Sequence, residues 1–306
     1  MARWLPRGGI VATIAVQVFV VASSVAPAVG RSTAPRPAGA TAAIPAHVVV
    51  IVMENKEYGT VIGSKSAPYL NRLARRNVLL ADDYAVTHPS LPNYLALTGG
   101  STFGIDSDCT TCSVRGTNIV DQLEAAKISW RAYMQSMPSS CYKGASDGDY
   151  AKKHDPFMYY TDISRSKARC GKVVPFTRFP SALRNGLPGF SWITPNLCFD
   201  MHDCSVAKGD GFLHRWVPRI EQHLGSDGIV IVVFDEGSSD DGCCDLGSAG
   251  GHVAAIIAGP GAAAKKHHVA TSDHYSLLRL IEDAFGLKRL RHARDASTPT
   301  IRHWRG

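Results

Sequence analysis

Two long apolar runs constrain most strongly what this chain can fold into. The first lies at His47 to Met53 (HVVVIVM) and the second at Gly228 to Phe234 (GIVIVVF). A strand that is apolar at successive positions needs cover on both faces, as in a parallel sheet between layers of helices. Shorter runs predict two further strands, at Phe190 to Ile193 and at Val253 to Ala258.

Amphipathic stretches lie between these runs and predict helices. The predicted helices cover Ala67 to Arg76, Leu91 to Thr98, Ile119 to Ala126, Phe212 to Leu224 and Ser276 to Phe285. Strands that alternate with helices indicate a layered α/β fold. The region 100–185 is rich in Gly, Ser, Cys, Tyr and Pro, and we expect it to form insertions over one end of the sheet.

The first residues have the pattern of an export signal. Arg3 and Arg7 precede an apolar stretch from Ile10 to Val25, and Ala26-Pro27-Ala28 supplies small residues at the cleavage spacing. This pattern predicts a signal peptide at residues 1–28 and a secreted protein. An uncleaved membrane anchor is the alternative, because the segment approaches the ~20 residues that span a bilayer.

The rest of the chain divides into three predicted parts. Residues 29–45 are rich in Ala, Pro, Thr and Gly without apolar periodicity, which is typical of a flexible linker. Residues 46–290 form the main domain, and 291–306 form a basic C-terminal tail. The net charge is +7 and much of its excess lies in this tail, which we expect to be solvated, with at most peripheral membrane contact. The sequence does not interleave arginine with aromatic residues in the way that indicates nucleic acid binding, so we do not expect nucleic acid as a partner.

Eight cysteines, an even number, predict disulfides in an exported chain. The spacing of Cys109 and Cys112 also fits half of a zinc site, but no second pair of ligands follows it. Pairing of Cys109 with Cys112 and of Cys198 with Cys204 is plausible, while the full connectivity stays open. Cys243 and Cys244 are adjacent, and we expect them to pair elsewhere because a bond between neighbours is strained.

Acidic residues follow both long apolar runs directly. Glu54 and Asn55 come after the first run, and Asp235 and Glu236 come after the second. Ligands bind beyond the carboxyl ends of strands in open α/β sheets, so these side chains are expected to share one site. Carboxylates that lie close together resist joint ionisation, and a divalent cation with oxygen ligands would supply the missing positive charge.

Ser90 stands at the start of a predicted helix, in the sequence His88-Pro89-Ser90-Leu91-Pro92. The local pattern alone is that of a capped helix. The same position presents a hydroxyl where the helix amides and dipole favour an anion. A metal ion at that hydroxyl would lower its pKa and create a nucleophile.

Histidines near the other strand ends complete the candidate site. Asp200 and His202 follow the strand at 190–193, and His252 precedes the strand at 253–258. His154 lies in the sequence Lys152-Lys153-His154-Asp155. Each of them can ligate a metal or move a proton, although any single one is more often a surface histidine.

Six ordered motifs between His47 and Leu287 resemble the bacterial phosphoesterase family of secreted acid phosphatases and phospholipases C. They are M-E-N, H-P-S-L-P-N-Y, T-P-N-L-C-F-D-M-H-D, F-D-E-G, G-G-H-V and D-H-Y-S-L-L-R-L-I-E. The short secreted acid phosphatases of actinobacteria are the most similar branch. The resemblance implies an alkaline phosphatase-like fold, a three-layer α/β/α sandwich with a central, mostly parallel sheet.

The resemblance also implies a role for each matching residue. Ser90 is the nucleophile and lies on one divalent metal ion, and Asn93 and His88 contact the substrate phosphate. The ligands of that ion are Glu54, Asn55, Asp235 and Glu236. A second metal site or a set of proton donors is implied for Asp200, His202 and His252, with His154 near the pocket. The long turn that contains Asp240, Asp241 and Cys243 departs from the family pattern just before His252.

These observations predict an acid phosphatase that hydrolyses phosphomonoesters through a phosphoserine at Ser90, with His202 as proton donor to the leaving oxygen. Its expected partners are small phosphate esters or phospholipid head groups, including phosphoinositides. A phospholipase C that cleaves phosphodiesters is the alternative within enzymes. A surface protein that binds phosphorylated ligands without cleaving them is the alternative from another class.

Overall fold

The computed structural model describes residues 1–2, 45, 47–244, 249–264, 266–268, 270–295, 297–302 and 304–305. The predicted signal peptide and linker fall almost wholly outside these residues. The compact unit that can be described lies within 43–306. None of the described helices is long and apolar enough to cross a membrane.

A central sheet organises the domain, with the strands in the order β10-β2-β9-β8-β1-β7-β3-β6 and with β11 beside β2. Their bounds are β1 (Val48–Met53), β2 (Val78–Tyr84), β3 (Trp130–Met134), β6 (Val173–Pro175), β7 (Phe190–Thr194), β8 (Ile229–Phe234), β9 (His252–Ala258), β10 (Lys266–His268) and β11 (Ser272–Asp273). β9 runs antiparallel to both of its neighbours, and all the other pairings are parallel. The expectation of a mostly parallel sheet is confirmed.

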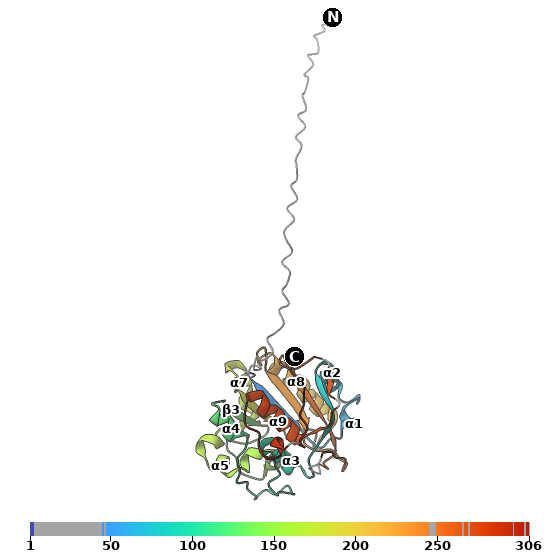
Figure 1. Cartoon of the computed structure of the whole chain (residues 1–306). Coiled ribbons are helices and arrows are strands. Elements are labelled where there is room, and N and C mark those ends of the chain that lie inside the picture. The colour runs from blue at the N-terminus through green and yellow to red at the C-terminus, as the bar shows by residue number, and fades with distance from the viewer. Residues whose placement is uncertain are drawn as a thin grey trace. The chain divides into compact units, whose positions relative to one another are not determined.

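Helices cover both faces of this sheet, because successive strand residues point to opposite sides. Val48, Val50 and Val52 of β1 pack in one core cluster, while Val49 and Ile51 pack in the other. The first face carries α3 (Ser90–Gly99), α4 (Ile119–Ala125) and α9 (His274–Phe285). The second carries α2 (Pro68–Arg76), α7 (Phe179–Asn185) and α8 (Val206–Glu221). The three layers are visible in Figure 1, and they confirm the predicted sandwich.

The four strands predicted from apolar runs are all present, and so are the five predicted helices. α8 begins at Val206, six residues before the predicted start, because Gly209 and Gly211 disfavour a helix in the sequence just before the apolar stripe. The region 100–185 does more than form insertions. It contributes α4 and the strands β3 and β6, which pair in parallel with each other and extend the sheet beyond β7.

All eight cysteines form disulfides. The bonds Cys109–Cys112 and Cys198–Cys204 agree with the predicted local pairing, and Cys141–Cys170 adds a third. The expectation that Cys243 and Cys244 pair elsewhere is wrong. These adjacent residues bond to each other in the turn that follows β8, and Cys244 there has a positive φ of 63°.

The chain after residue 290 packs on the domain instead of forming the solvated tail that its charge suggested. α10 (Arg291–Arg294) buries Ala293, and Ile301 and Trp304 join the core cluster beside α9. Arg291 donates to the carbonyls of Gly99 and Thr117 at 2.8 and 2.7 Å. A basic side chain can therefore serve the fold, here by capping the last carbonyl of α3 and joining it to the loop before α4.

Asp83 in β2 is a buried carboxylate whose ionised form is disfavoured in the folded protein. It is 0% exposed, it accepts a hydrogen bond from Ser272 Oγ, and its Oδ2 has no partner among the described residues. Burial raises the pKa of Asp83 to about 8. Between about pH 4 and pH 8 the unfolded chain therefore releases a proton that the folded protein keeps, and the free energy of unfolding falls as the pH rises.

We predict that Asp83→Asn removes this part of the pH dependence. The variant should match the parent protein near about pH 4 and exceed its unfolding free energy by roughly 2–5 kcal/mol near about pH 8. Denaturant titrations at both pH values measure the difference. Asp147→Asn, at an exposed carboxylate that makes no contact with Asp83, is the control that should leave the slope unchanged. Equal slopes for the parent and Asp83→Asn would contradict this prediction.

Candidate active site

Four acidic side chains meet at the carboxyl ends of three adjacent parallel strands. Glu54 follows β1, Asp235 and Glu236 follow β8, and Asp200 follows β7 after a short turn. All four are buried, with exposures of 5% or less. Backbone hydrogen bonds fix the strand ends to one another, from Glu54 N to Asp200 O and from Asp235 N to Met53 O. The predicted convergence of 54, 200, 235 and 236 follows from this parallel register.

Ser90 lies at the start of α3, and its hydroxyl points into this carboxylate cluster. Its Oγ lies 3.2 Å from Glu54 Oε2 and 3.0 Å from Glu236 Oε1. Ser90 is fully buried and is the first residue of α3, whose N-cap position is taken by Pro89 and not by the serine as its sequence suggested. The hydroxyl is therefore directed by the carboxylates and not by helix capping, which separates this serine from an ordinary N-cap residue.

Burial and mutual repulsion disfavour ionisation of the cluster. Burial raises the pKa of Glu54 well above its usual range, and the nearby Asp235 and Asp200 raise it further. Burial raises the pKa of Asp235 to about 7, with repulsion from Glu236 as the next cause. The pKa of Asp200 likewise rises to about 7 through burial. Such a cluster is stable at neutral pH only if a cation or protons offset its charge.

The donor atoms fit a divalent cation. Glu54, His154 and Asp200 each offer a ligand atom, and these atoms lie within 4.8 Å of one another. The side-chain end of Asn55 lies 3.1 Å from Glu54 Oε2 and 3.0 Å from Glu236 Oε1. If the amide nitrogen of Asn55 faces these two oxygens, it donates a hydrogen bond to both of them. If the amide oxygen faces them instead, it adds another oxygen ligand for a cation. Asp235 Oδ2 and Asp200 Oδ2 are buried without a hydrogen-bond partner among the described residues, as expected for atoms reserved for a metal ion.

Two of the predicted histidines lie at the cluster. His154 is buried, with Nε2 at 3.2 Å from Glu54 Oε2 and Nδ1 at 3.4 Å from Asp200 Oδ2. Burial lowers the pKa of His154 well below its usual range, so its ring is neutral. His202 is partly exposed, receives its orientation from a bond between Nδ1 and Asp203 Oδ1 of 2.6 Å, and lies 5.5 Å from His154 between ring centres. His202 thus lies at the solvent side of the cluster.

His252 is not brought into this cluster. Its ring stacks on Tyr58 and Tyr84, and its Nε2 lies 3.0 Å from Ala81 O. Its backbone N–H donates to Glu57 at 2.9 Å. None of the contacts of His252 with described residues reaches Ser90 or the four carboxylates. The ring is held by its neighbours in the sheet, which accounts for its separation from the metal-ligating set.

Asn93 and His88 support the nucleophile loop with the atoms that were predicted to hold phosphate. Asn93 Oδ1 accepts from the amides of Val86 and Thr87 at 2.9 and 3.2 Å, and its Nδ2 donates to Thr87 O and Pro89 O. An amide side chain with two donors and one carbonyl has little capacity left after these bonds. His88 bonds Glu236 Oε2 through Nδ1 and Ser239 O through Nε2.

Three residues that the sequence did not single out complete the site. Tyr94 donates to Glu54 Oε1 from within α3. Lys153 Nζ lies 2.9 Å from Asp108 Oδ2 and 3.3 Å from His202 Nε2. Asp108 also accepts from the amide of Leu91, immediately after Ser90, at 3.0 Å. Tyr94 and Lys153 both stand inside quoted sequence motifs, whereas nothing in the sequence around Asp108 signals its contact with α3.

The fold is similar to that of solved proteins that include a member of the alkaline phosphatase superfamily. A protein of that superfamily from Vibrio parahaemolyticus superposes with a TM-score of 0.53 at 12% identity, over 84% of this chain and 71% of that one. A lipoteichoic acid synthase from Listeria monocytogenes superposes with a TM-score of 0.57 at 9% identity, over 82% and 75%. At such low identity these structures show the fold alone.

Sequence comparison identifies the family. The profile of the Phosphoesterase family matches residues 64–288, and the chain belongs to this family. A phosphatidylinositol-3-phosphatase of Mycobacterium tuberculosis is 33% identical over 84% of this chain and 83% of that protein. An acid phosphatase of Aspergillus fumigatus is 30% identical over 60% of this chain, but the match spans only 43% of the fungal protein. The expectation of a phosphoric ester hydrolase is confirmed.

We predict that a divalent cation stabilises the chelator-treated protein, more strongly near about pH 8 than near about pH 5, because protons compete for the same oxygens. At a free cation concentration ~100 times Kd the stabilisation is about 2.7 kcal/mol, which a shift in melting temperature reports. Asp235→Asn should lose most of the shift. Asp203→Asn, which changes an exposed carboxylate beside the cluster, should retain it. A shift that persists in Asp235→Asn would place the cation elsewhere.

Proposed function

We propose that this protein is a secreted acid phosphatase that hydrolyses phosphomonoesters with Ser90 as nucleophile. The observation that carries the proposal is the position of Ser90 Oγ, within 3.2 Å of two buried carboxylates at the start of a helix. A serine hydroxyl needs a base or a cation beside it to attack phosphorus, and this cluster offers both. The phosphatases among the relatives support the same reaction class.

Glu54, Asn55, Asp235 and Glu236 would hold the cation, and Asp200 and His154 offer further ligand atoms beside Glu54. When bound there, a divalent ion supplies positive charge that lowers the pKa of the attacking hydroxyl and offsets charge on the phosphoryl oxygens. A single ion suffices for these roles. Its chemical identity is left to elemental analysis of the purified protein.

The chain's own groups account for both halves of the reaction. Ser90 Oγ attacks phosphorus while its proton passes to Glu236 or Glu54, the bond from phosphorus to the ester oxygen breaks, and His202 protonates the departing alcohol. Water then attacks the phosphorus of the phosphoserine and gives a proton to His202. The bond from phosphorus to the Ser90 oxygen breaks, and this oxygen takes back the proton that the carboxylate held. The buried ring of His154 lies between Glu54 and Asp200 and fills the space behind them.

Lys153 is proposed to bind the phosphoryl group. Its ammonium lies beside His202 and is tied by Asp108 to the helix start that follows Ser90. The salt bridge to Asp108 outweighs burial and raises the pKa of Lys153, so the group carries its charge at working pH. A phosphoryl group placed for attack by Ser90 would meet this ammonium at the start of α3.

The proposed substrates are small phosphate monoesters or phosphoinositide head groups, in line with the activity named for the mycobacterial relative. Four disulfides and the leader-like first 28 residues support an extracellular location. Parallel assays with p-nitrophenyl phosphate and p-nitrophenyl phosphorylcholine distinguish this proposal from a phospholipase C. Faster hydrolysis of the diester would favour the phospholipase.

Ser90→Ala is expected to abolish turnover of p-nitrophenyl phosphate. A loss of ~1000-fold or more in kcat corresponds to at least about 4 kcal/mol of barrier at ~1.4 kcal/mol per tenfold. Ser101→Ala, just beyond the other end of the same helix, is the matched control and should keep the parent rate. Acid-quenched enzyme should carry a phosphoryl group on Ser90. Near-normal turnover by Ser90→Ala would defeat the mechanism.

Lys153→Ala is expected to raise KM for phosphate monoesters about tenfold and to lower kcat, because one charge-assisted contact to the phosphoryl group is lost. Lys153→Arg should recover part of the loss. Lys143→Ala, at an exposed lysine away from the cluster, serves as the control. Steady-state kinetics and the affinity for inorganic phosphate as inhibitor measure both effects. Unchanged phosphate inhibition in Lys153→Ala would remove this residue from the site.

A further inference from the structure

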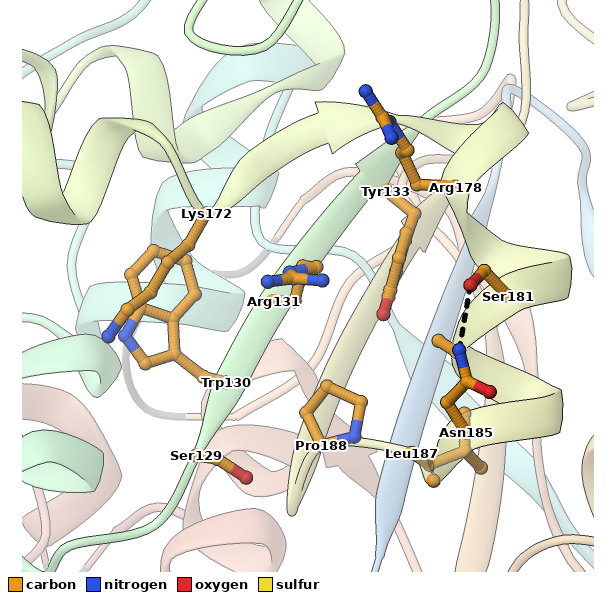
Figure 2. A pocket seen from close by; sticks show the side chains of 12 residues that line it. Ser129, Trp130, Arg131, Tyr133, Lys172, Arg178, Ser181, Asn185, Leu187 and Pro188 are labelled. Carbon is orange, nitrogen blue, oxygen red and sulfur yellow. Dashed lines mark hydrogen bonds between the residues drawn. The ribbon is translucent and has the colours of Figure 1, made fainter.

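A second cavity lies at the outer edge of the sheet, between β3 and α7, and Figure 2 shows the side chains that line it. Its volume is about 500 Å³. Ser129 and Trp130 at the start of β3, and Leu187 and Pro188 just before β7, form one end of it. The catalytic cluster lies at the opposite, carboxyl ends of these parallel strands, so the cavity is a separate site.

The cavity is strongly basic. Arg131, Arg178 and Lys172 line it, and none of the described residues on its wall is a carboxylate. Lys172 is neutralised by Glu124 at 2.7 Å. Arg131 and Arg178 are exposed, and neither makes an ion pair with a described residue. Two uncompensated guanidinium groups on one cavity leave it with an excess positive charge.

A buried hydroxyl without a partner lies on the same wall. Tyr133 is 0% exposed, and its OH makes no hydrogen bond with the described residues. Figure 2 shows this hydroxyl directed into the space between Arg131 and Pro188. Burial raises the pKa of Tyr133 to about 12, and the charge and close approach of the Arg131 guanidinium oppose that rise. A buried tyrosine hydroxyl normally finds a partner, so this one indicates that a ligand group belongs there.

Neutral polar groups line the opposite side. Ser181 and Asn185 of α7 bond to each other at 3.0 Å and face the cavity across from Arg131. Serine and asparagine side chains suit the hydroxyls of a polyol, while guanidinium groups suit a phosphate. The volume exceeds what a lone phosphate would fill.

We propose that this β3/α7 cavity binds a phosphate-bearing polyol, with the phosphate between Arg131 and Arg178, the Tyr133 hydroxyl as a further donor, and the polyol against Ser181 and Asn185. A free phosphorylated polyol and the head group of an anionic phospholipid both carry this combination of a phosphate and hydroxyl groups. Binding at the cavity involves no covalent step. It does not depend on the function proposed for Ser90.

The experiment uses the full chain with Ser90→Ala, so that the probe is not consumed. Calorimetric titration with inositol 1-phosphate should give two classes of site in this background. Adding R131Q and R178Q should remove one class, lowering its affinity roughly a hundredfold for two lost charged contacts. R184Q, on the exposed side of the same helix α7, is the matched control and should leave both classes intact. Binding by inositol 1-phosphate that R131Q/R178Q leaves unchanged, whether in one class of site or two, would overturn the proposal. A single class that R131Q/R178Q removes would keep this proposal and count against phosphate binding at Ser90.

Two further measurements test the proposal even if the R131Q/R178Q variant fails to fold. S181D places a negative charge in the cavity and should weaken the same class of site at least tenfold, whereas S181A should weaken it only slightly. Sedimentation with phosphatidylcholine vesicles, with and without phosphatidylinositol 3-phosphate, distinguishes a lipid head group from the free polyol. Equal binding by S181D and S181A would contradict the cavity as the site. With Ser90 intact, R131Q/R178Q should hydrolyse p-nitrophenyl phosphate at the parent rate, so a failure of the catalytic proposal would be seen separately.

Discussion

The site depends on four buried carboxylates that the parallel register of β7, β1 and β8 brings to one edge of the sheet. Water does not solvate them, and repulsion from Asp235 and Asp200 adds to the burial that disfavours the ionised form of Glu54. Such a cluster is stable only where a cation or bound protons offset its charge, because an unpaired buried charge costs several kcal/mol. Tyr94 and Asn55 supply hydrogen bonds around the cluster but no net positive charge. The fold thus places buried carboxylates that can ligate a cation directly beside the hydroxyl of Ser90.

Hydrogen bonds around the cluster hold the nucleophile and the long turn in place. Asn93 fastens the loop before Ser90 through four bonds to its backbone. Glu57 accepts the amides of Ser238, Ser239 and His252, and so closes the turn that follows Asp235 and Glu236. Gly251 lies at this closure with φ of +94°, and a Cβ there would meet Gly237 at 2.7 Å. The turn with the Cys243–Cys244 bond is therefore anchored at both ends, although its length departs from the family pattern.

The sequence was sufficient where a single physical signal dominated. Uninterrupted apolar strands predicted β1 and β8, and the acidic residues that follow them predicted the cluster, because parallel strand ends must meet. β2 and β3 escaped detection because one has a polar second half and the other carries an exposed Arg131. Asn93 and His252 were given direct roles because a motif names residues but not the atoms to which they bond. Asp108 reaches α3 from a loop stapled by Cys109–Cys112, and only tertiary structure reveals that contact.

The carboxylate cluster and the β3/α7 cavity carry opposite charges, and these charges set the order in which the two sites can bind a phosphate. At the carboxyl ends of the strands, carboxylates repel a phosphate dianion until a cation has bound, so substrate and metal ion must bind cooperatively there. The β3/α7 cavity has no carboxylate among its described lining residues and needs no cation first. A phosphate-bearing polyol should therefore bind to the metal-free protein at the edge cavity alone, with an affinity that falls as salt screens the two arginines. Removal of the metal thus separates the two sites without any mutation, because only the catalytic one derives its attraction for phosphate from a bound ion.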